Sequence, residues 1–261
     1  MEQLRQTPIF RKYVMPGRLP AEEQFRRATG VDIRSDIWEI LVTHNSNDGV
    51  VMLRGKFTEM GMEPKLQREG VQRLGYKGYT MLGDERNAVA FLNPTTAIAG
   101  RTPALRQVID RRNDAAGVPK VLAEKIRQIP SSNQVWFAGD GSGGIPSLES
   151  GQLAAMLKLL GNVKLVWGGI AIDKGLDVKI EAAALTEEGA VQLQDAIRGL
   201  IGFGRLSTPS DRTELLRLYD TMQVEAASRT VHLKAAIPEG LLEELIRLLS
   251  TASEPGSRRP N

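Results

Sequence analysis

The order of the apolar segments constrains the fold of this chain more than any other feature. Residues 37–44 and 50–57 alternate as strands do, and the Asn45-Ser46-Asn47-Asp48-Gly49 cluster between them is typical of a hairpin turn. A helical segment is expected next, and a second pair of strands and a second helix follow it. The predicted strands of this half are residues 37–44, 50–57, 76–82 and 88–99, and the predicted helices begin at Thr58 and Thr102.

The same order of elements returns in the second half of the chain. Its predicted strands are residues 164–172, 176–185, 223–227 and 230–237, and its predicted helices begin at Thr186, Thr213 and Leu241. The offset between the halves is 128 residues at two landmarks, from Ile37 to Leu165 and from Thr58 to Thr186. An equal offset at both landmarks indicates a tandem structural duplication. The alternative is that two unrelated α+β segments share a coarse order by chance.

Two strands, a helix, two strands and a helix form the ferredoxin-like βαββαβ arrangement with its last strand moved to the front. We therefore predict an α+β fold of tandem duplicated ββαββα units, with antiparallel sheets and helices packed on one face of each. The predicted parts are an N-terminal helical segment (1–35), a first repeat (36–116), a connecting helix-strand-helix (117–162), a second repeat (163–252) and a disordered tail (253–261).

The first strand of each half is apolar on both faces. Residues 37–44 place Trp38, Ile40 and Val42 on one face and Ile37 and Leu41 on the other, and residues 165–172 are apolar or glycine on both. A sheet that is covered on one side only alternates apolar and polar residues. Both faces of these strands are therefore expected to be buried, either by the other half of the chain or by a partner chain.

The composition excludes most catalytic chemistry. The 261 residues contain no cysteine, which excludes disulfides, thiolate nucleophiles and cysteine-bearing zinc sites. Two histidines, His44 and His232, are expected to have structural or solvent-facing roles, and we predict no metal, cofactor or catalytic residue. With 34 basic and 31 acidic residues the net charge is +3, which gives no reason to expect nucleic-acid binding. No segment reaches the roughly 18 uninterrupted apolar residues of a transmembrane segment.

One glycine-rich segment resembles a phosphate-binding motif. Gly139, Gly141 and Gly144 satisfy the spacing G-x-G-x-x-G after a predicted strand, and Ser142 and Ser147 lie in or just beyond the same segment. However, Ile145-Pro146-Ser147 separates the last glycine from the next helix, and no acidic residue lies between Glu149 and Asp173. A turn or loop is the simpler interpretation. An anion or small-molecule site at Gly139, Gly141, Ser142, Gly144 and Ser147 is the alternative.

Several short motifs together resemble those of a family of bacterial hypothetical proteins, of the kind found in acidobacteria. The motifs are residues 1–10, 29–32, 54–57, 135–137 and 167–170. They are packing and turn signatures, so the resemblance implies no activity. Members of that family tend to begin with an export signal upstream of the segment that here starts at Met1. The resemblance therefore implies residence in the periplasm or cell envelope if such a signal precedes this chain, and in the cytoplasm otherwise.

The sequence thus favours a non-enzymatic binding or scaffold protein that acts through sheet surfaces on a protein partner or on a copy of itself. This hypothesis depends on the apolar second face of the first strands. The alternative hypothesis is a small-molecule or anion-binding protein, or an enzyme, that uses the glycine-rich segment 139–144.

Overall fold

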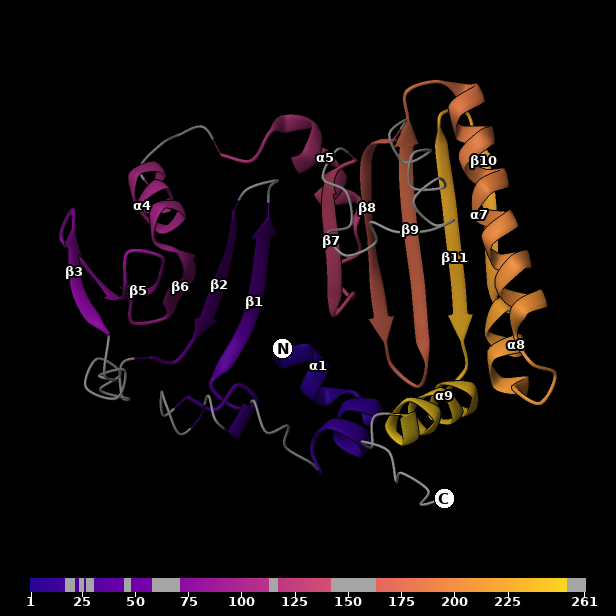
Figure 1. The fold of residues 1–261 in the computed structure, drawn as a ribbon, viewed down its shortest axis with the longest axis horizontal. Coiled ribbons are helices and arrows are strands. Elements are labelled where there is room, and N and C mark those ends of the chain that lie inside the picture. Colours follow the sequence, from indigo (N-terminus) through magenta and orange to yellow (C-terminus); the bar gives the residue numbers. More distant parts are fainter. Residues whose placement is uncertain are drawn as a thin grey trace, which may run out of the picture. The chain divides into compact units, whose positions relative to one another are not determined.

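The computed structural model describes residues 1–16, 22–23, 26, 31–44, 48–57, 71–112, 117–141 and 163–252, with the side chains of 249–252 excepted. The chain divides into two compact units, Met1–Gly117 and Val118–Asn261 (Figure 1). Both combine helices with an antiparallel sheet, which confirms the α+β class. The predicted helix that begins at Thr58 and the second helix of the predicted connecting segment lie mainly or wholly outside the described residues, as does the tail after 252.

The first unit begins with short helical segments and continues into a sheet. Its described strands form one antiparallel sheet in the order β1-β2-β6-β5-β4-β3. The elements are α1 (Glu2–Gln6), the π-helix η1 (Phe10–Val14), β1 (Ile37–His44), β2 (Gly49–Gly55), β3 (Gln72–Tyr76), β4 (Tyr79–Gly83), β5 (Asn87–Asn93), β6 (Thr96–Arg101) and α4 (Thr102–Arg111).

Helix α4 covers one face of this first sheet. Pro103 lies in its first turn, where the missing N–H costs nothing. Its apolar side chains Leu105 and Ile109 are buried, and they form a core with Ile98 and Met81 from the sheet. The helix contacts β2, β5 and β6.

The opposite face of the first sheet is covered at one end only, by the N-terminal segment. Val31, Ile37, Phe57 and Ala97 form a second buried cluster, and the ring of Phe57 lies 5.8 Å from that of Phe91. The remainder of this face has no such cluster among the described residues.

The second unit contains a longer and more regular sheet. Its described strands form an antiparallel sheet in the order β10-β11-β9-β8-β7. The elements are α5 (Lys120–Gln128), β7 (Val135–Asp140), β8 (Val163–Ile172), β9 (Leu176–Ala184), α7 (Glu187–Ser207), α8 (Thr213–Asp220), β10 (Met222–Ala227), β11 (Thr230–Ile237) and α9 (Glu239–Ala252).

Helix α7 covers one face of the second sheet. Thr186 caps its first turn, because the hydroxyl oxygen accepts a hydrogen bond of 3.0 Å from the Gly189 N–H. Ala190 and Leu193 of the helix are buried against Val224 and Val231 of the sheet. The helix contacts β9, β10 and β11.

The prediction that helices pack on one face only is wrong for the second unit. Successive side chains of a strand point to opposite faces, so Trp167 lies on the face opposite Val166, which packs in the α7 core. Helix α5 contacts β7 and β8, and its Lys125 ammonium lies 4.1 Å from the centre of the Trp167 ring. Trp167 is only 3% exposed. This α5 contact covers an apolar face that the sequence left without a partner.

Two strand predictions in the first half each include a turn that was not predicted. Residues 76–82 turn at Lys77-Gly78, whose φ angles of 45° and 83° reverse the chain between β3 and β4. Residues 88–99 turn at Pro94-Thr95, between β5 and β6. The first sheet consequently has more strands than the predicted repeat. The described part of the predicted connecting segment, 117–162, supplies α5 and β7 to the second unit.

Candidate interaction surface

Strand β7 lies at the edge of the second sheet and carries large apolar side chains on both faces. Alternation along the strand places Val135 and Phe137 on the face that α7 covers and Trp136 on the face that α5 covers. All three side chains belong to residues that are 37% to 43% exposed. Neither helix covers these side chains completely, so β7 offers an aromatic surface to solvent.

Strand β1 lies at an edge of the first sheet and shows a similar exposure. Trp38, Ile40 and Val42 are 37%, 42% and 64% exposed, although Ile37 at the start of the strand is fully buried. The N-terminal segment covers only the end of the strand near Ile37. The expectation that both faces of this strand are buried therefore does not hold within the described residues, because its outer half remains uncovered.

The structure describes only the first part of the proposed anion site. Gly139 lies in β7, opposite Val166. The Gly141 N–H donates a hydrogen bond of 3.1 Å to the Lys164 carbonyl, so the sheet already uses this donor. A side chain on Gly141 would place its Cβ 2.0 Å from the Val163 carbonyl oxygen, which explains a glycine there by close packing. Ser142, Gly144 and Ser147 lie outside the described residues, and the anion site stays a prediction.

The two glycines differ in a way that a substitution pair can test. Gly141→Ala is expected to lower the free energy of unfolding of the second unit by about 1–3 kcal/mol, because the added Cβ overlaps the Val163 backbone. Gly139→Ala is the matched control, because no atom lies within 4 Å of its added Cβ, and it should change stability by less than about 0.5 kcal/mol. Urea unfolding followed by circular dichroism measures both. Equal effects of the two substitutions would contradict the packing role of Gly141.

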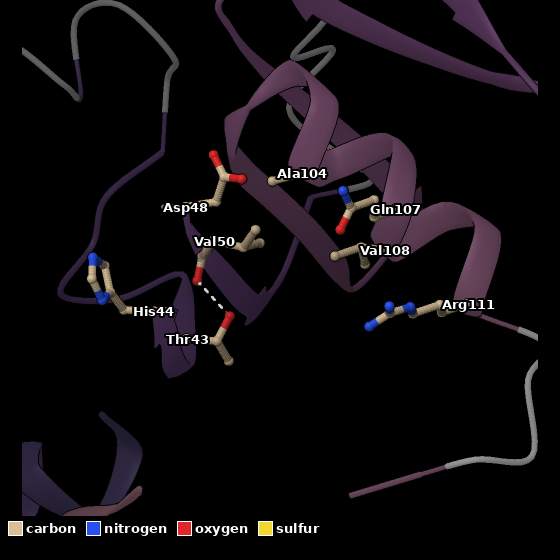
Figure 2. A pocket seen from close by; sticks show the side chains of 8 residues that line it. All are labelled: Thr43, His44, Asp48, Val50, Ala104, Gln107, Val108 and Arg111. Carbon is tan, nitrogen blue, oxygen red and sulfur yellow. Dashed lines mark hydrogen bonds between the residues drawn. The ribbon is translucent and has the colours of Figure 1, made fainter. Parts of the chain in front are cut away.

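A depression of ≈ 210 Å³ lies between the β1–β2 hairpin and α4 (Figure 2). His44 and Arg111 lie at opposite ends of it, and hydrogen bonds within the chain already engage some of its other polar groups. The Asp48 carboxylate pairs with Arg101 at 3.2 Å, and the Thr43 hydroxyl donates to the Val50 carbonyl at 3.3 Å. The lining residues are Thr43, His44, Asp48, Val50, Ala104, Gln107, Val108 and Arg111. They do not aim an acid, a base and a nucleophile at one point.

The second histidine has a simple structural environment. His232 lies on β11 directly opposite Glu181 of β9, and its Nδ1 is 2.9 Å from the Glu181 carboxylate. Such a cross-strand pair stabilises a sheet without further partners. Within the described part of the chain, no group of three or more His, Asp or Glu residues is placed to hold a metal ion.

A polar cluster that was not predicted joins the β3–β4 turn to α4. The Asp110 carboxylate accepts hydrogen bonds from Lys77 at 2.6 Å and from the Tyr76 hydroxyl at 3.0 Å. The Lys77 bond, together with the Tyr76 bond, lowers the pKa of Asp110 below its ordinary value. The hydrogen bond to Asp110 in turn raises the pKa of the Tyr76 hydroxyl. Lys77 and Asp110 are solvent-exposed, and Tyr76 is half-buried against the first core. The cluster therefore holds the turn against α4 and forms no reactive centre.

Comparisons with known proteins relate the chain to solved structures by fold alone. No protein-family model and no curated protein sequence matches the chain. Crystal form III of TP0453 is similar with a TM-score of 0.51 and 8% identity, over 91% of this chain and 88% of that one. Crystal form I of TP0453 aligns with a TM-score of 0.47 and 10% identity, over 87% of this chain and 89% of that one. Within the part of the chain that the structure describes, no helix is long and apolar enough to cross a membrane.

Proposed function

We propose that this protein is a non-enzymatic binding or scaffold protein that acts through its exposed sheet surfaces on a protein partner or on a copy of itself. One observation carries the proposal. Two edge strands, β1 and β7, each expose a group of large apolar side chains, which are Trp38, Ile40 and Val42 on β1 and Val135, Trp136 and Phe137 on β7.

Contiguous exposed apolar residues are costly in water and mark interaction sites on soluble proteins. The few residues that dominate the binding energy between two proteins are enriched in tryptophan, tyrosine and arginine. Strand β7 places an indole and a phenyl ring on opposite faces of one edge, so a partner strand there would cover both. These features support binding of a protein rather than of a small polar ligand.

We also infer that the two units are copies of one ββαββα arrangement. In the first unit β1-β2-β6-β5 lie in this order, and in the second unit β8-β9-β11-β10 lie in the corresponding order. Each series begins with a hairpin, and a helix follows the last of the four strands, α4 in one unit and α9 in the other. The β3–β4 hairpin is then an addition to the first copy and β7 an addition to the second. Superposition of the four strands in experimentally determined structures tests this correspondence.

Site-specific photocrosslinking in cells that naturally produce the protein tests the proposed function. A photoreactive phenylalanine analogue replaces Val42 or Trp136 at the two apolar edges, and Gln107 or Glu188 at exposed polar positions of α4 and α7 serves as the matched control. We expect a discrete protein adduct at position 42 or 136 that is absent at 107 and 188. Absence of an adduct at both apolar positions would contradict the proposal.

A further inference from the structure

The two edges of the second sheet differ in how their backbone groups are satisfied. At the β10 edge the Arg198 guanidinium donates two hydrogen bonds to the Val224 carbonyl, from Nε at 3.1 Å and from Nη2 at 2.7 Å. The Gln194 side-chain oxygen accepts a hydrogen bond from the Ala226 N–H. Both side chains come from α7 and take the place of a neighbouring strand. This edge is therefore closed to a further strand.

The described edges of the first sheet are also protected. Strand β1 has an irregular register between Ile37 and Glu39, and Arg5 donates a hydrogen bond to the Ile37 carbonyl. Bulges and side-chain contacts of this kind disturb the flat edge that a new strand requires. Strand β3 is five residues long and begins with the exposed residues Gln72 and Arg73. Short strands with charged side chains discourage pairing.

Strand β7 has no register shift against β8, and no described side chain bonds the backbone groups on its outer side. The Gly141 N–H bonds to Lys164 of β8, and alternation in an antiparallel ladder then assigns Val135, Phe137 and Gly139 to the bonds with β8. Trp136 and Ala138 consequently direct their N–H and C=O groups away from the sheet. Neither residue makes a hydrogen bond on that side to any described residue. With respect to the described residues this edge is open, and apolar side chains lie on both of its faces.

From this open edge, and resting on the proposed function, we infer that β7 pairs antiparallel with β7 of a second copy about a twofold axis at Ala138. The strand is complementary to itself in this register. Ala138 lies opposite Ala138 of the second copy, and Phe137 lies opposite Gly139 of the second copy. A phenyl ring over a glycine shields the exposed backbone of the neighbouring strand. The two sheets then become one continuous sheet.

Charge is compatible with this register. Asp140 is the only charged residue of β7, and the twofold places it opposite Trp136 of the second copy. The two Asp140 positions are then four residues apart along the strands, or about 13 Å at a rise of ~3.3 Å per residue. This separation exceeds the Debye length of about 8 Å at physiological ionic strength. Like charges therefore do not oppose the pairing.

The buried area sets the strength of the association. Each copy brings three side chains that are already more than half buried, so the contact covers only a few hundred Å², against roughly 1,200–2,000 Å² for stable complexes. Backbone hydrogen bonds from Trp136 and Ala138 add to this contact. We expect a dimer that forms at micromolar or higher protein concentrations and dissociates on dilution.

A disulfide test reports the register directly, because the full chain contains no native cysteine. Ala138→Cys places two thiols opposite each other with Cα atoms about 5.5 Å apart, within the roughly 4.4–6.8 Å that a disulfide spans. Gly139→Cys is the register control, since its two thiols are diagonal neighbours about 7–8 Å apart. Ala226→Cys is the edge control on the closed β10 strand. We expect a disulfide dimer with Ala138→Cys under mild oxidation and several-fold less with either control.

Charge substitutions at the axis supply a second and independent test by sedimentation equilibrium. Ala138→Lys and Ala138→Glu should each weaken self-association by up to about fivefold, since like charges then lie opposite each other, and an equimolar mixture of the two should restore a heterodimer. A full chain that stays monomeric to several hundred micromolar overturns the inference, as does a dimer that neither charge substitution weakens. If the position 136 photocrosslink captures a different protein while the chain stays monomeric, the proposed function survives and the self-pairing fails.

Discussion

Leu105→Ala is expected to lower the free energy of unfolding of the first unit by about 2–5 kcal/mol, because truncation of a buried leucine leaves a cavity that the core fills only in part. Leu105 is fully buried where α4 meets the sheet, in the same cluster as Ile98 and Met81. For a unit of this size the loss corresponds to a decrease in Tm of roughly 8–20 °C. Hydrogen exchange measured by mass spectrometry locates the effect.

The exchange pattern also distinguishes the two units. With Leu105→Ala, peptides from β5, β6 and α4 should exchange faster, whereas peptides from β9 to β11 should not change, since those strands belong to the second unit. Gln107→Ala, at an exposed position of the same helix, is the matched control and should alter stability by less than about 0.5 kcal/mol. A loss below 1 kcal/mol for Leu105→Ala would show that α4 does not pack on the sheet as described.

Hairpins with strong turn signals were predictable from the sequence. Asp173-Lys174-Gly175 separates a long apolar run from an alternating one, and the structure has β8 and β9 on either side of that turn. The strands 223–227 and 230–237 likewise agree with β10 and β11 within one residue. In these segments the period of two, the turn residues and the burial all favour the same structure.

The two missed turns have different physical causes. The turn at Lys77-Gly78 requires a positive φ at Lys77, and lysine disfavours the left-handed region. The residue at the first turn position therefore gives no sign of a turn. Pro94-Thr95 follows Asn93, and Asn-Pro is a recognised turn signal, but it lies within an apolar run that favours one long strand. Local patterning alone does not decide between one strand and a hairpin in such runs.

The features that define the candidate surface depend on contacts between distant residues. Arg198 and Gln194 of α7 close the β10 edge through bonds to residues 26 and 32 positions later in the chain, and no local pattern shows this. The sequence did indicate that the apolar strands need cover. It did not show that β8 obtains its cover from α5, or that the outer half of β1 has none among the described residues.

Trp167→Ala should lower the free energy of unfolding of the second unit by about 3–5 kcal/mol, the range for loss of a large buried aromatic side chain. The indole is 3% exposed and lies under Lys125 of α5. Its removal takes away a ring that α5 contacts through Lys125, and no residue of that helix is itself buried. We therefore expect faster hydrogen exchange in α5 and β7 together, in addition to the global loss that urea unfolding measures.

Trp167→Phe separates packing from polarity at the same position. The buried indole N–H has no hydrogen-bond acceptor among the described residues, so phenylalanine removes an unsatisfied donor while it keeps much of the apolar area. Its cost should be about 1 kcal/mol, well below that of alanine. If phenylalanine costs as much as alanine, the indole N–H has a partner that stabilises the fold. If both substitutions leave the exchange of α5 unchanged, the cover of the second face by α5 is contradicted, and the apolar side of β8 depends on another contact for its burial.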